Sequence, residues 1–157
     1  MNKTIYFDMD GTIVDLYGVE GWLDMLLAEN TAPYDNAKPL ISFSVLARYI
    51  HKLQAQGHKV GIISWLSKNT SENYSAAVAQ AKRNYLAKHL PSVVFDEIHI
   101  IPYGTPKSTC VSNIHTINIL FDDEYNNKVE WIKSTHGYAF SPISINGIIK
   151  NILQGGL

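Results

Sequence analysis

Two aspartates near the N-terminus, Asp8 and Asp10, are the residues of this chain whose types and spacing most clearly indicate chemistry. They follow an apolar run and stand two positions apart, so both side chains can point to the same side at the end of a strand. A carboxylate can attack phosphorus and form an acyl phosphate, while a second carboxylate handles the protons. Gly11 permits a sharp turn directly after the pair.

A carboxylate that attacks a phosphate approaches an anion, so cations must neutralise the charge of both groups. Mg²⁺ prefers a few carboxylates together with water and substrate oxygens. Asp122 and Asp123 offer two further carboxylates for such an ion. Lys107 offers a compact cation, and Ser64 a hydroxyl, to the phosphoryl oxygens. The set of residues predicts Mg²⁺-assisted transfer of a phosphoryl group.

These residues lie at, or just past, the ends of predicted strands. The predicted strands are apolar runs at residues 3–7, 59–63, 97–101, 117–121 and, more briefly, 138–140. Segments of helical periodicity separate them, at residues 19–29, 39–56, 69–90, about 129–137 and 145–153. Strands that alternate with helices predict an α/β, Rossmann-like three-layer sandwich with a central parallel sheet. Ligands of such sheets bind beyond the carboxyl ends of the strands, where the predicted site residues would meet.

Caps and breakers set the expected helix boundaries. Pro39 is expected in the first turn of the helix that Gly57 ends. Asn69, with Glu72 three positions later, resembles a capping box for the next helix. The segment 30–38, which contains Pro33, is predicted to be a loop.

Length and composition favour one globular domain over residues 1–157, with 46% hydrophobic and 17% charged residues. The net charge of -1 excludes a bulk field toward a nucleic-acid polymer or a membrane surface. Cys110 is the single cysteine, which favours a reduced, cytoplasmic location and is expected to be a buried bystander. The six histidines lack the spacing of a zinc site. Composition leaves a homo-oligomer open.

The order of these motifs resembles that of the haloacid dehalogenase (HAD) superfamily. Residues 8–12, Asp-Met-Asp-Gly-Thr after an apolar strand, are similar to its first motif. Residues 62–64 and Lys107 are similar to the second and third motifs, and residues 119–123 to the fourth. The resemblance covers nearly the whole chain, and the first motif is its most specific part.

The resemblance implies a hydrolase that works in two steps. Asp8 would attack phosphorus while Asp10 protonates the leaving oxygen, and Asp10 would then activate the water that hydrolyses the aspartyl phosphate. Mg²⁺ would be held by Asp8, Asp122 and the backbone carbonyl of Asp10, with Asp123 in support. Ser64 and Lys107 would bind the phosphate. Gly11 and Thr12 would support the turn.

Residues 119–138 also resemble, loosely, the deoxyribonucleotidase branch of the superfamily, which makes a nucleoside monophosphate or another small phosphorylated metabolite the expected substrate. Many members insert a cap domain after the first motif. Here only residues 16–38 remain for a reduced cap. Trp22, Tyr34 and Trp65 could stack on a nucleobase, although aromatic residues at such positions more often belong to a core.

Two other functions fit parts of the pattern. A receiver-like signalling domain also uses aspartates, a hydroxyl and a lysine on a parallel sheet, but there the acid pair and the phosphorylated aspartate lie on different strands and the lysine comes last. A catalytically idle domain that binds a phosphorylated partner is the other possibility, and the expected residue type at every catalytic position argues against it. Lys68 is a weaker competitor for the role of Lys107, and Asp123 or a neighbour could cap the following helix.

Overall fold

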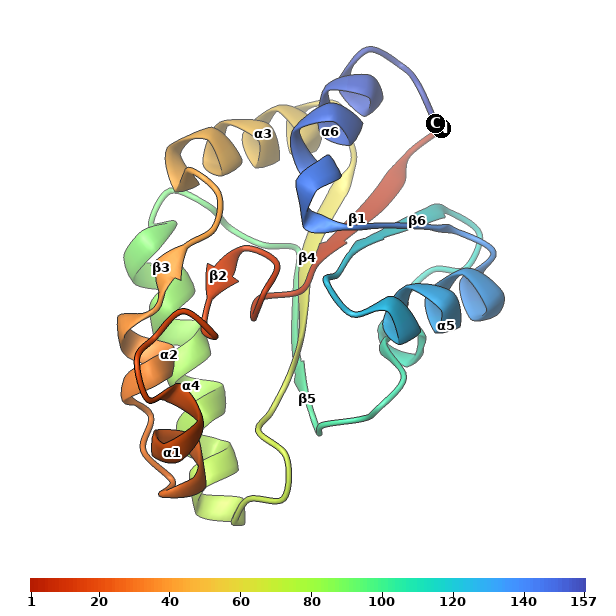
Figure 1. The fold of residues 1–157 in the computed structure, drawn as a ribbon. Helices are drawn as coiled ribbons and strands as arrows, with labels where there is room; N and C mark the ends of the chain where they lie inside the picture. Colours follow the sequence, from red (N-terminus) through yellow and green to blue (C-terminus); the bar gives the residue numbers. More distant parts are fainter.

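The computed structural model describes residues 1–157 and has a parallel five-stranded sheet at its centre (Figure 1). The strands are β1 (Lys3–Phe7), β4 (Lys59–Trp65), β5 (Glu97–Ile101), β6 (Ile117–Phe121) and β7 (Tyr138–Phe140). Their spatial order is β5-β4-β1-β6-β7, and every neighbouring pair is parallel. Counted along the chain, this order is 3-2-1-4-5, as in Rossmann folds. The five predicted strands and the α/β fold class are confirmed.

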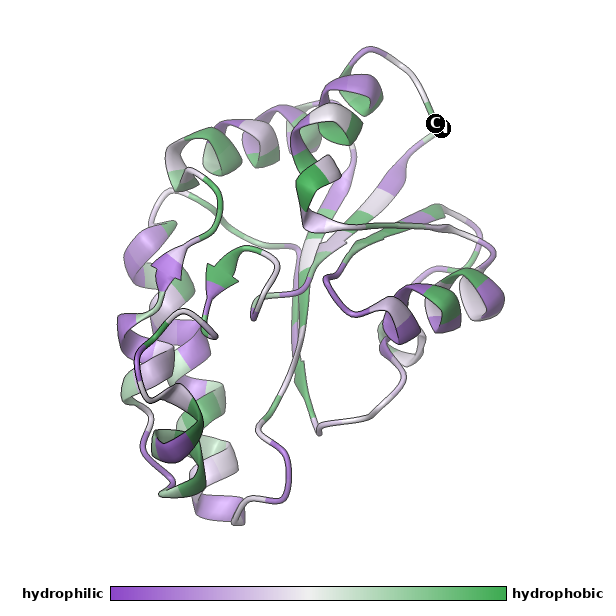
Figure 2. Ribbon diagram, viewed as in Figure 1, coloured by the Kyte–Doolittle hydropathy of each residue, from purple (hydrophilic) through white to green (hydrophobic).

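Helices cover both faces of the sheet, which explains why β1 is buried along its whole length. Ile5 and Phe7 belong to the larger core, on the face that packs against α3 (Phe43–Ala55), α6 (Ile145–Leu153) and part of α4 (Glu72–His89). Tyr6 points to the other face, where Trp131 of α5 (Tyr125–Thr135) meets it edge-on at 5.5 Å between ring centroids. Figure 2 shows apolar colouring along the central strands and mixed colouring on the surrounding helices.

The segment between β1 and α3 is more structured than predicted. It holds β2 (Val14–Asp15), α1 (Trp22–Leu27), α2 (Ala32–Asn36) and β3 (Lys38–Pro39), and β2 pairs with β3 in a small antiparallel ribbon. The predicted loop at residues 30–38 was therefore wrong. Pro33 lies in the first turn of α2, where the missing N–H has no helical partner to lose, and α2 buries Tyr34 against α4.

Three expected boundaries were also wrong. Pro39 pairs in β3, and α3 begins only at Phe43. The cap of α4 is Ser71, whose Oγ accepts from the backbone N–H of Tyr74 at 3.2 Å, whereas Asn69 adopts a left-handed φ of 53°. β4 continues through Ser64 to Trp65. The predicted end of α4 before Pro91 and the predicted final helix are confirmed.

Two short 3₁₀ turns complete the chain, η1 (Lys107–Cys110) and η2 (Pro142–Ser144). The first of these carries Lys107 on its first residue. None of the helices combines the length and the apolarity that crossing a bilayer requires.

Candidate active site

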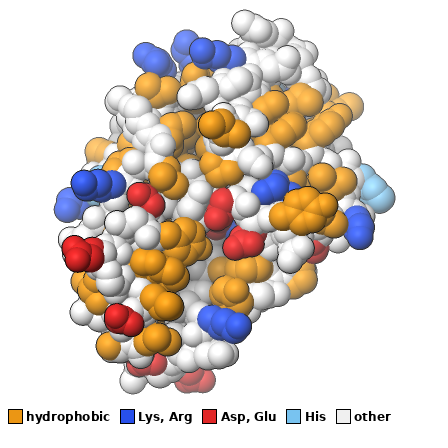
Figure 3. Space-filling model, viewed as in Figure 1, with side chains coloured by type: hydrophobic (Ala, Val, Ile, Leu, Met, Phe, Trp, Pro, Cys, Tyr) orange, Lys and Arg blue, Asp and Glu red, His pale blue; other side chains and the backbone are white.

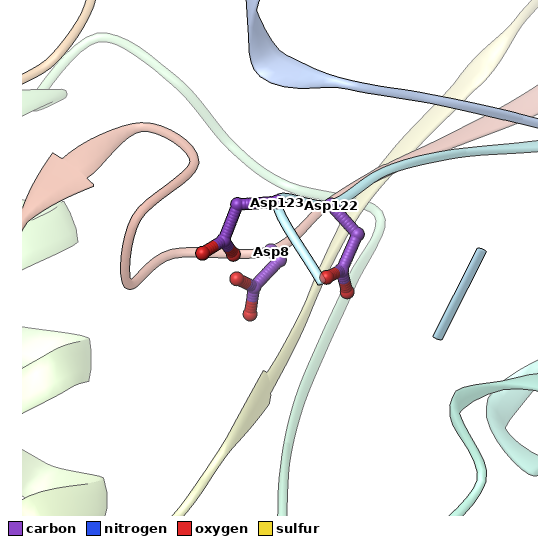
Figure 4. A group of neighbouring side chains, drawn as sticks. All are labelled: Asp8, Asp122 and Asp123. Carbon is purple, nitrogen blue, oxygen red and sulfur yellow. The ribbon is translucent and has the colours of Figure 1, made fainter. Parts of the chain in front are cut away.

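The carboxyl ends of β1 and β6 bring the first and last acidic motifs together. Phe7 pairs with Phe121, and the backbone N–H of Asp8 donates to the carbonyl of Phe121 at 2.9 Å, so Asp8 and Asp122 leave the sheet side by side. Figure 4 shows the carboxylates of Asp8, Asp122 and Asp123 grouped at this edge. One oxygen from each lies within 4.8 Å of the others, although Asp8 stands more than a hundred positions before Asp122 and Asp123.

This group has the donor chemistry of a Mg²⁺ site, because carboxylate oxygens are the ligands that Mg²⁺ prefers and substrate oxygens can complete the shell. Asp8 and Asp122 are buried, and Asp123 is the more open member. The family resemblance gave Asp123 only a supporting place, whereas its carboxylate lies in the same group as those of Asp8 and Asp122. The carboxylate of Asp10 lies outside this group, and binding of a metal by its backbone carbonyl stays a prediction.

Lys107 joins the group as its cation. From the first residue of η1, its Nζ lies 2.8 Å from Asp8 and 2.6 Å from Asp122. Burial of the ammonium opposes its charge, but the carboxylates of Asp8 and Asp122 outweigh burial and raise the pKa of Lys107 above its ordinary value. Lys107 is therefore a permanent cation beside the Asp8 carboxylate. Lys68, the competitor, lies at a tyrosine ring instead.

The turn after β1 connects the two acidic strand ends. The Thr12 hydroxyl lies 3.2 Å from Asp8 Oδ2 and accepts from the backbone N–H of Asp123 at 3.1 Å. Gly11 has a φ of 76°, and a Cβ there would come within 2.4 Å of Asp123 Oδ2. The glycine lets the turn pass close to Asp123, which is the supporting role that the sequence suggested for this segment.

Lys82 is a site residue that the sequence reasoning missed. Its Nζ donates to Asp10 Oδ2 at 2.6 Å, to Ser64 Oγ at 2.8 Å and to the carbonyl of Trp65 at 2.7 Å, and its side chain is 1% exposed. A signal was present in the sequence. Lys82 stands on the buried stripe of α4 with Val78 and Leu86, four residues away on either side, and a charge on such a stripe requires a partner.

Ser64 and Asp10 are thereby connected through one ammonium. Ser64 is fully buried inside β4, and its role as a phosphate ligand stays a prediction. The Asp10 side chain is 17% exposed and lines the cleft in front of Asp8. Burial raises the pKa of Asp10 above its ordinary value, and the positive charge of Lys82 partly offsets this effect.

Four carboxylates, those of Asp8, Asp10, Asp122 and Asp123, share the site with two ammonium groups. Their formal charges leave an excess of two negative charges when all are ionised. Burial, together with the charge of Asp8, raises the pKa of Asp122, and burial with the charges of Asp8 and Asp122 raises that of Asp123 to about 6. A divalent cation would balance this excess.

The raised pKa of Asp123 predicts an unusual pH dependence for the metal-free protein. Because the folded-state pKa of about 6 lies above the ordinary pKa of an aspartate, the folded protein holds the proton more tightly than the unfolded chain. The Asp123 contribution should therefore lower the free energy of unfolding as pH rises from about 4 to 6. Chemical denaturation of wild type and Asp123→Asn in chelator measures it: the variant should be the more stable at pH 7, and its advantage should vanish near pH 4.

Mg²⁺ is expected to reverse the order of the two proteins, because an ion bound by the three carboxylates would stabilise the folded form and Asp123→Asn would remove one ligand. Equal stabilisation of both proteins by Mg²⁺ would contradict the assignment of Asp123 to the metal group.

Two members of the acidic group, Asp8 and Asp123, line a cleft of about 460 Å³. Figure 3 shows acidic side chains near the centre of the face, with hydrophobic side chains gathered beside them. Asp8, Asp10, Lys107 and Asp123 line the cleft on its polar side. Trp22, Tyr34 and Trp65, the three aromatic residues noted in the sequence, all line it as well.

The sequence suggested that Asp123 or a neighbour caps the helix that follows. The N-cap residue of α5 is Glu124, whose side chain makes no capping bond, although Asp122 Oδ1 accepts from its backbone N–H at 2.8 Å. Cys110 was expected to be buried, but it is only partly buried and lies in η1, outside the cleft lining.

No protein-family model and no curated protein matches the chain. Among solved structures, it is similar to a chain of a Pnkp1/Rnl/Hen1 complex, with a TM-score of 0.58 and 19% identity over 90% of this chain and 45% of that one. It is also similar to a D,D-heptose 1,7-bisphosphate phosphatase from Burkholderia thailandensis, with a TM-score of 0.50 and 12% identity over 85% of this chain and 74% of that one. This chain thus spans less than half of the first of these neighbours. At such identities the likeness shows a shared fold, the α/β sandwich described above.

Proposed function

We propose that this protein is a Mg²⁺-dependent phosphomonoester hydrolase of the HAD type in which Asp8 is transiently phosphorylated. The observation that carries the proposal is the position of the Asp8 carboxylate. It lies at the head of a cleft, 2.8 Å from the ammonium of Lys107 and beside two further carboxylates that can hold a divalent cation. The fold shared with a heptose bisphosphate phosphatase supports the same class of reaction.

In this proposal the steps of the reaction are divided among the site residues. Asp8 attacks phosphorus and displaces the alcohol, which takes its proton from Asp10; Asp10 then removes a proton from the water that releases phosphate from Asp8. Lys107 neutralises the charge of the phosphoryl oxygens, and the Ser64 hydroxyl orients them. Mg²⁺ held by Asp8, Asp122 and Asp123 would supply the positive charge that lets two anions approach.

The order of the strands supports a hydrolase over a receiver-like domain. Receiver domains such as CheY follow the order 2-1-3-4-5, whereas this sheet follows 3-2-1-4-5. In this chain the acid pair, Asp8 and Asp10, includes the proposed nucleophile and follows a single strand. Lys107 also precedes Asp122, whereas the lysine of a receiver domain comes last in the chain. A domain that only binds phosphate would not need Asp10 to be held beside Asp8 by a buried lysine.

The substrate is proposed to be a small phosphorylated metabolite, with nucleoside monophosphates among the candidates. Residues 16–38 would act as the reduced cap, because Trp22 and Tyr34 from this segment line the cleft. With no larger insertion between β1 and α3, the cap can enclose only part of a substrate.

Hydrolysis of p-nitrophenyl phosphate tests the proposal. We expect the purified protein to release p-nitrophenol with Mg²⁺, to lose this activity in EDTA and to regain it when Mg²⁺ is restored. Acid-quenched protein should carry covalent phosphate during turnover. Binding of phosphate without any turnover would support the idle domain. Turnover that EDTA leaves unchanged would contradict the proposed role of Mg²⁺.

A further inference from the structure

One wall of the cleft is an apolar helix with no buried residue. Five of the six residues of α1, Trp-Leu-Asp-Met-Leu-Leu, are apolar, yet none is buried, and Leu23 and Leu27 are 51% and 75% exposed. Four of them, Trp22, Leu23, Leu26 and Leu27, line the cleft. Leu26 also packs against the buried cluster that contains Leu16 and Tyr34, so α1 is anchored to the fold by one side chain while the others stay open. In α1 they face the space in front of Asp8.

Aromatic pairs extend the apolar lining on both sides of the cleft. Tyr17 meets Trp22 edge-on, with 5.1 Å between ring centroids. Trp65 and Tyr103, from the end of β4 and the loop after β5, lie 4.8 Å apart. All four rings line the same cleft. The two pairs come from segments far apart in the chain, so the fold brings aromatic surfaces together around the opening.

The Trp65 ring connects the reaction centre to this lining. Its Nε1 donates to the carbonyl of Thr105 at 2.8 Å, which holds the ring in place without any group from a ligand. Lys107 Nζ lies 5.4 Å from the centre of the same ring. A phosphate held by Lys107 would therefore place the atoms next to its ester oxygen against Trp65.

Charged groups are few in the outer cleft. Beyond the residues of the reaction centre, only Lys68 and Glu124 contribute charges to the lining, and Lys68 already lies 5.6 Å from the centre of the Tyr103 ring. Ser67, Asn69, Thr70 and Asn127 add uncharged hydrogen-bonding groups, and half of the lining residues are hydrophobic. A flat aromatic group would gain contact with rings on both sides.

Resting on the proposed hydrolase function, we infer that the cleft selects phosphomonoesters whose leaving group carries an uncharged aromatic ring, which binds between α1 and the Trp65–Tyr103 pair. Trp22 and Tyr103 are the specificity-determining residues, since both face the cleft and neither contacts the reacting carboxylates. The ring can belong to a nucleobase or to a simple aryl group, because stacking does not distinguish them.

Non-hydrolysable phosphonates test this inference independently of turnover. Isothermal titration of the whole protein with Mg²⁺ compares phenylpropyl phosphonate with propyl phosphonate, which differ only in the ring. We expect the aromatic ligand to bind at least about 10-fold more tightly, the gain that stacking on one or two rings supplies. Trp22→Ala and Tyr103→Ala should each reduce this ratio several-fold and leave the affinity for propyl phosphonate unchanged.

Tyr125→Ala is the matched control, because Tyr125 is 74% exposed and does not line the cleft. Trp22→Leu keeps an apolar residue on α1 in case alanine unfolds that helix, and it should also lower the ratio. Competition by adenosine monophosphate and by phenyl phosphate then separates a nucleobase from a simple aryl group as the preferred ring.

Equal affinity for the two phosphonates in wild type would overturn the inference while leaving the hydrolase proposal intact. Conversely, absence of p-nitrophenyl phosphate turnover with the ring preference retained would refute the hydrolase and keep the aromatic site. A dimer in sedimentation that Trp22→Ala dissociates, together with equal phosphonate affinities, would assign the apolar wall of α1 to self-association instead.

Discussion

Asp8→Asn is expected to reduce phosphatase turnover to below roughly one ten-thousandth of wild type, the scale of loss seen when a nucleophile is removed. An amide oxygen is a far weaker nucleophile toward phosphorus than a carboxylate and forms no acyl phosphate. The fold should survive, because the asparagine carbonyl can still accept from Lys107, which lies 2.8 Å from Asp8 Oδ1. Steady-state rates and the amount of acid-stable covalent phosphate measure the effect.

Asp24→Asn is the matched control for this experiment. It makes the same change of charge at an exposed residue of α1 that does not line the cleft, so activity should remain within about two-fold of wild type, as expected for a surface substitution. If Asp8→Asn retained full turnover, or still became phosphorylated at the wild-type rate, another residue would be the nucleophile.

Lys82→Met is expected to lower the free energy of unfolding by about 3–5 kcal/mol, the cost of removing one partner from a buried ion pair. Methionine fills much of the same volume, so the loss reflects charge and hydrogen bonds more than a cavity. Asp10, Ser64 and the carbonyl of Trp65 would all lose the donor that now lies within 2.8 Å. Denaturant unfolding curves measure the change.

The same substitution should move the pH profile of turnover. Burial already raises the pKa of Asp10 and the charge of Lys82 opposes this, so its removal should raise that pKa further. In the proposed reaction, Asp10 must be ionised to activate water, so the acid limb of the kcat profile should shift to higher pH. A stability loss with an unmoved profile would limit Lys82 to a structural role.

Two controls distinguish an effect of the Lys82–Asp10 ion pair from a general effect of substitutions in α4. Lys88→Met changes an exposed lysine of the same helix and should leave both stability and the pH profile nearly unchanged. In Lys82→Met with Asp10→Asn, the unpaired buried charge is absent, so the double variant should be more stable than the sum of the single losses predicts. Strict additivity would contradict a direct contribution from the ion pair.

Apolar runs and helical periodicity within short segments were sufficient to predict most of the strands and helices. The apolar run before Asp8 and the one before Asp122 predicted two strands whose ends meet, and the structure pairs them in register. Boundaries that depend on local alternatives were wrong, since Ser71 rather than Asn69 caps α4 and Pro33 lies in the first turn of a helix. Several neighbouring residues can begin or cap a helix at such positions, and tertiary packing decides which of them does so.

By itself, the sequence determined which residue types carry the chemistry and the edge of the sheet at which they gather, because strand ends and motif order are local properties. The tertiary structure alone decided their partners: Lys82 for Asp10, Lys107 for both Asp8 and Asp122, and the apolar face of α1 for the cleft. Each pairing joins elements distant in the chain, and its energy depends on burial, which raises the cost of a lone charge and so imposes a partner. No periodicity along a single segment encodes that requirement.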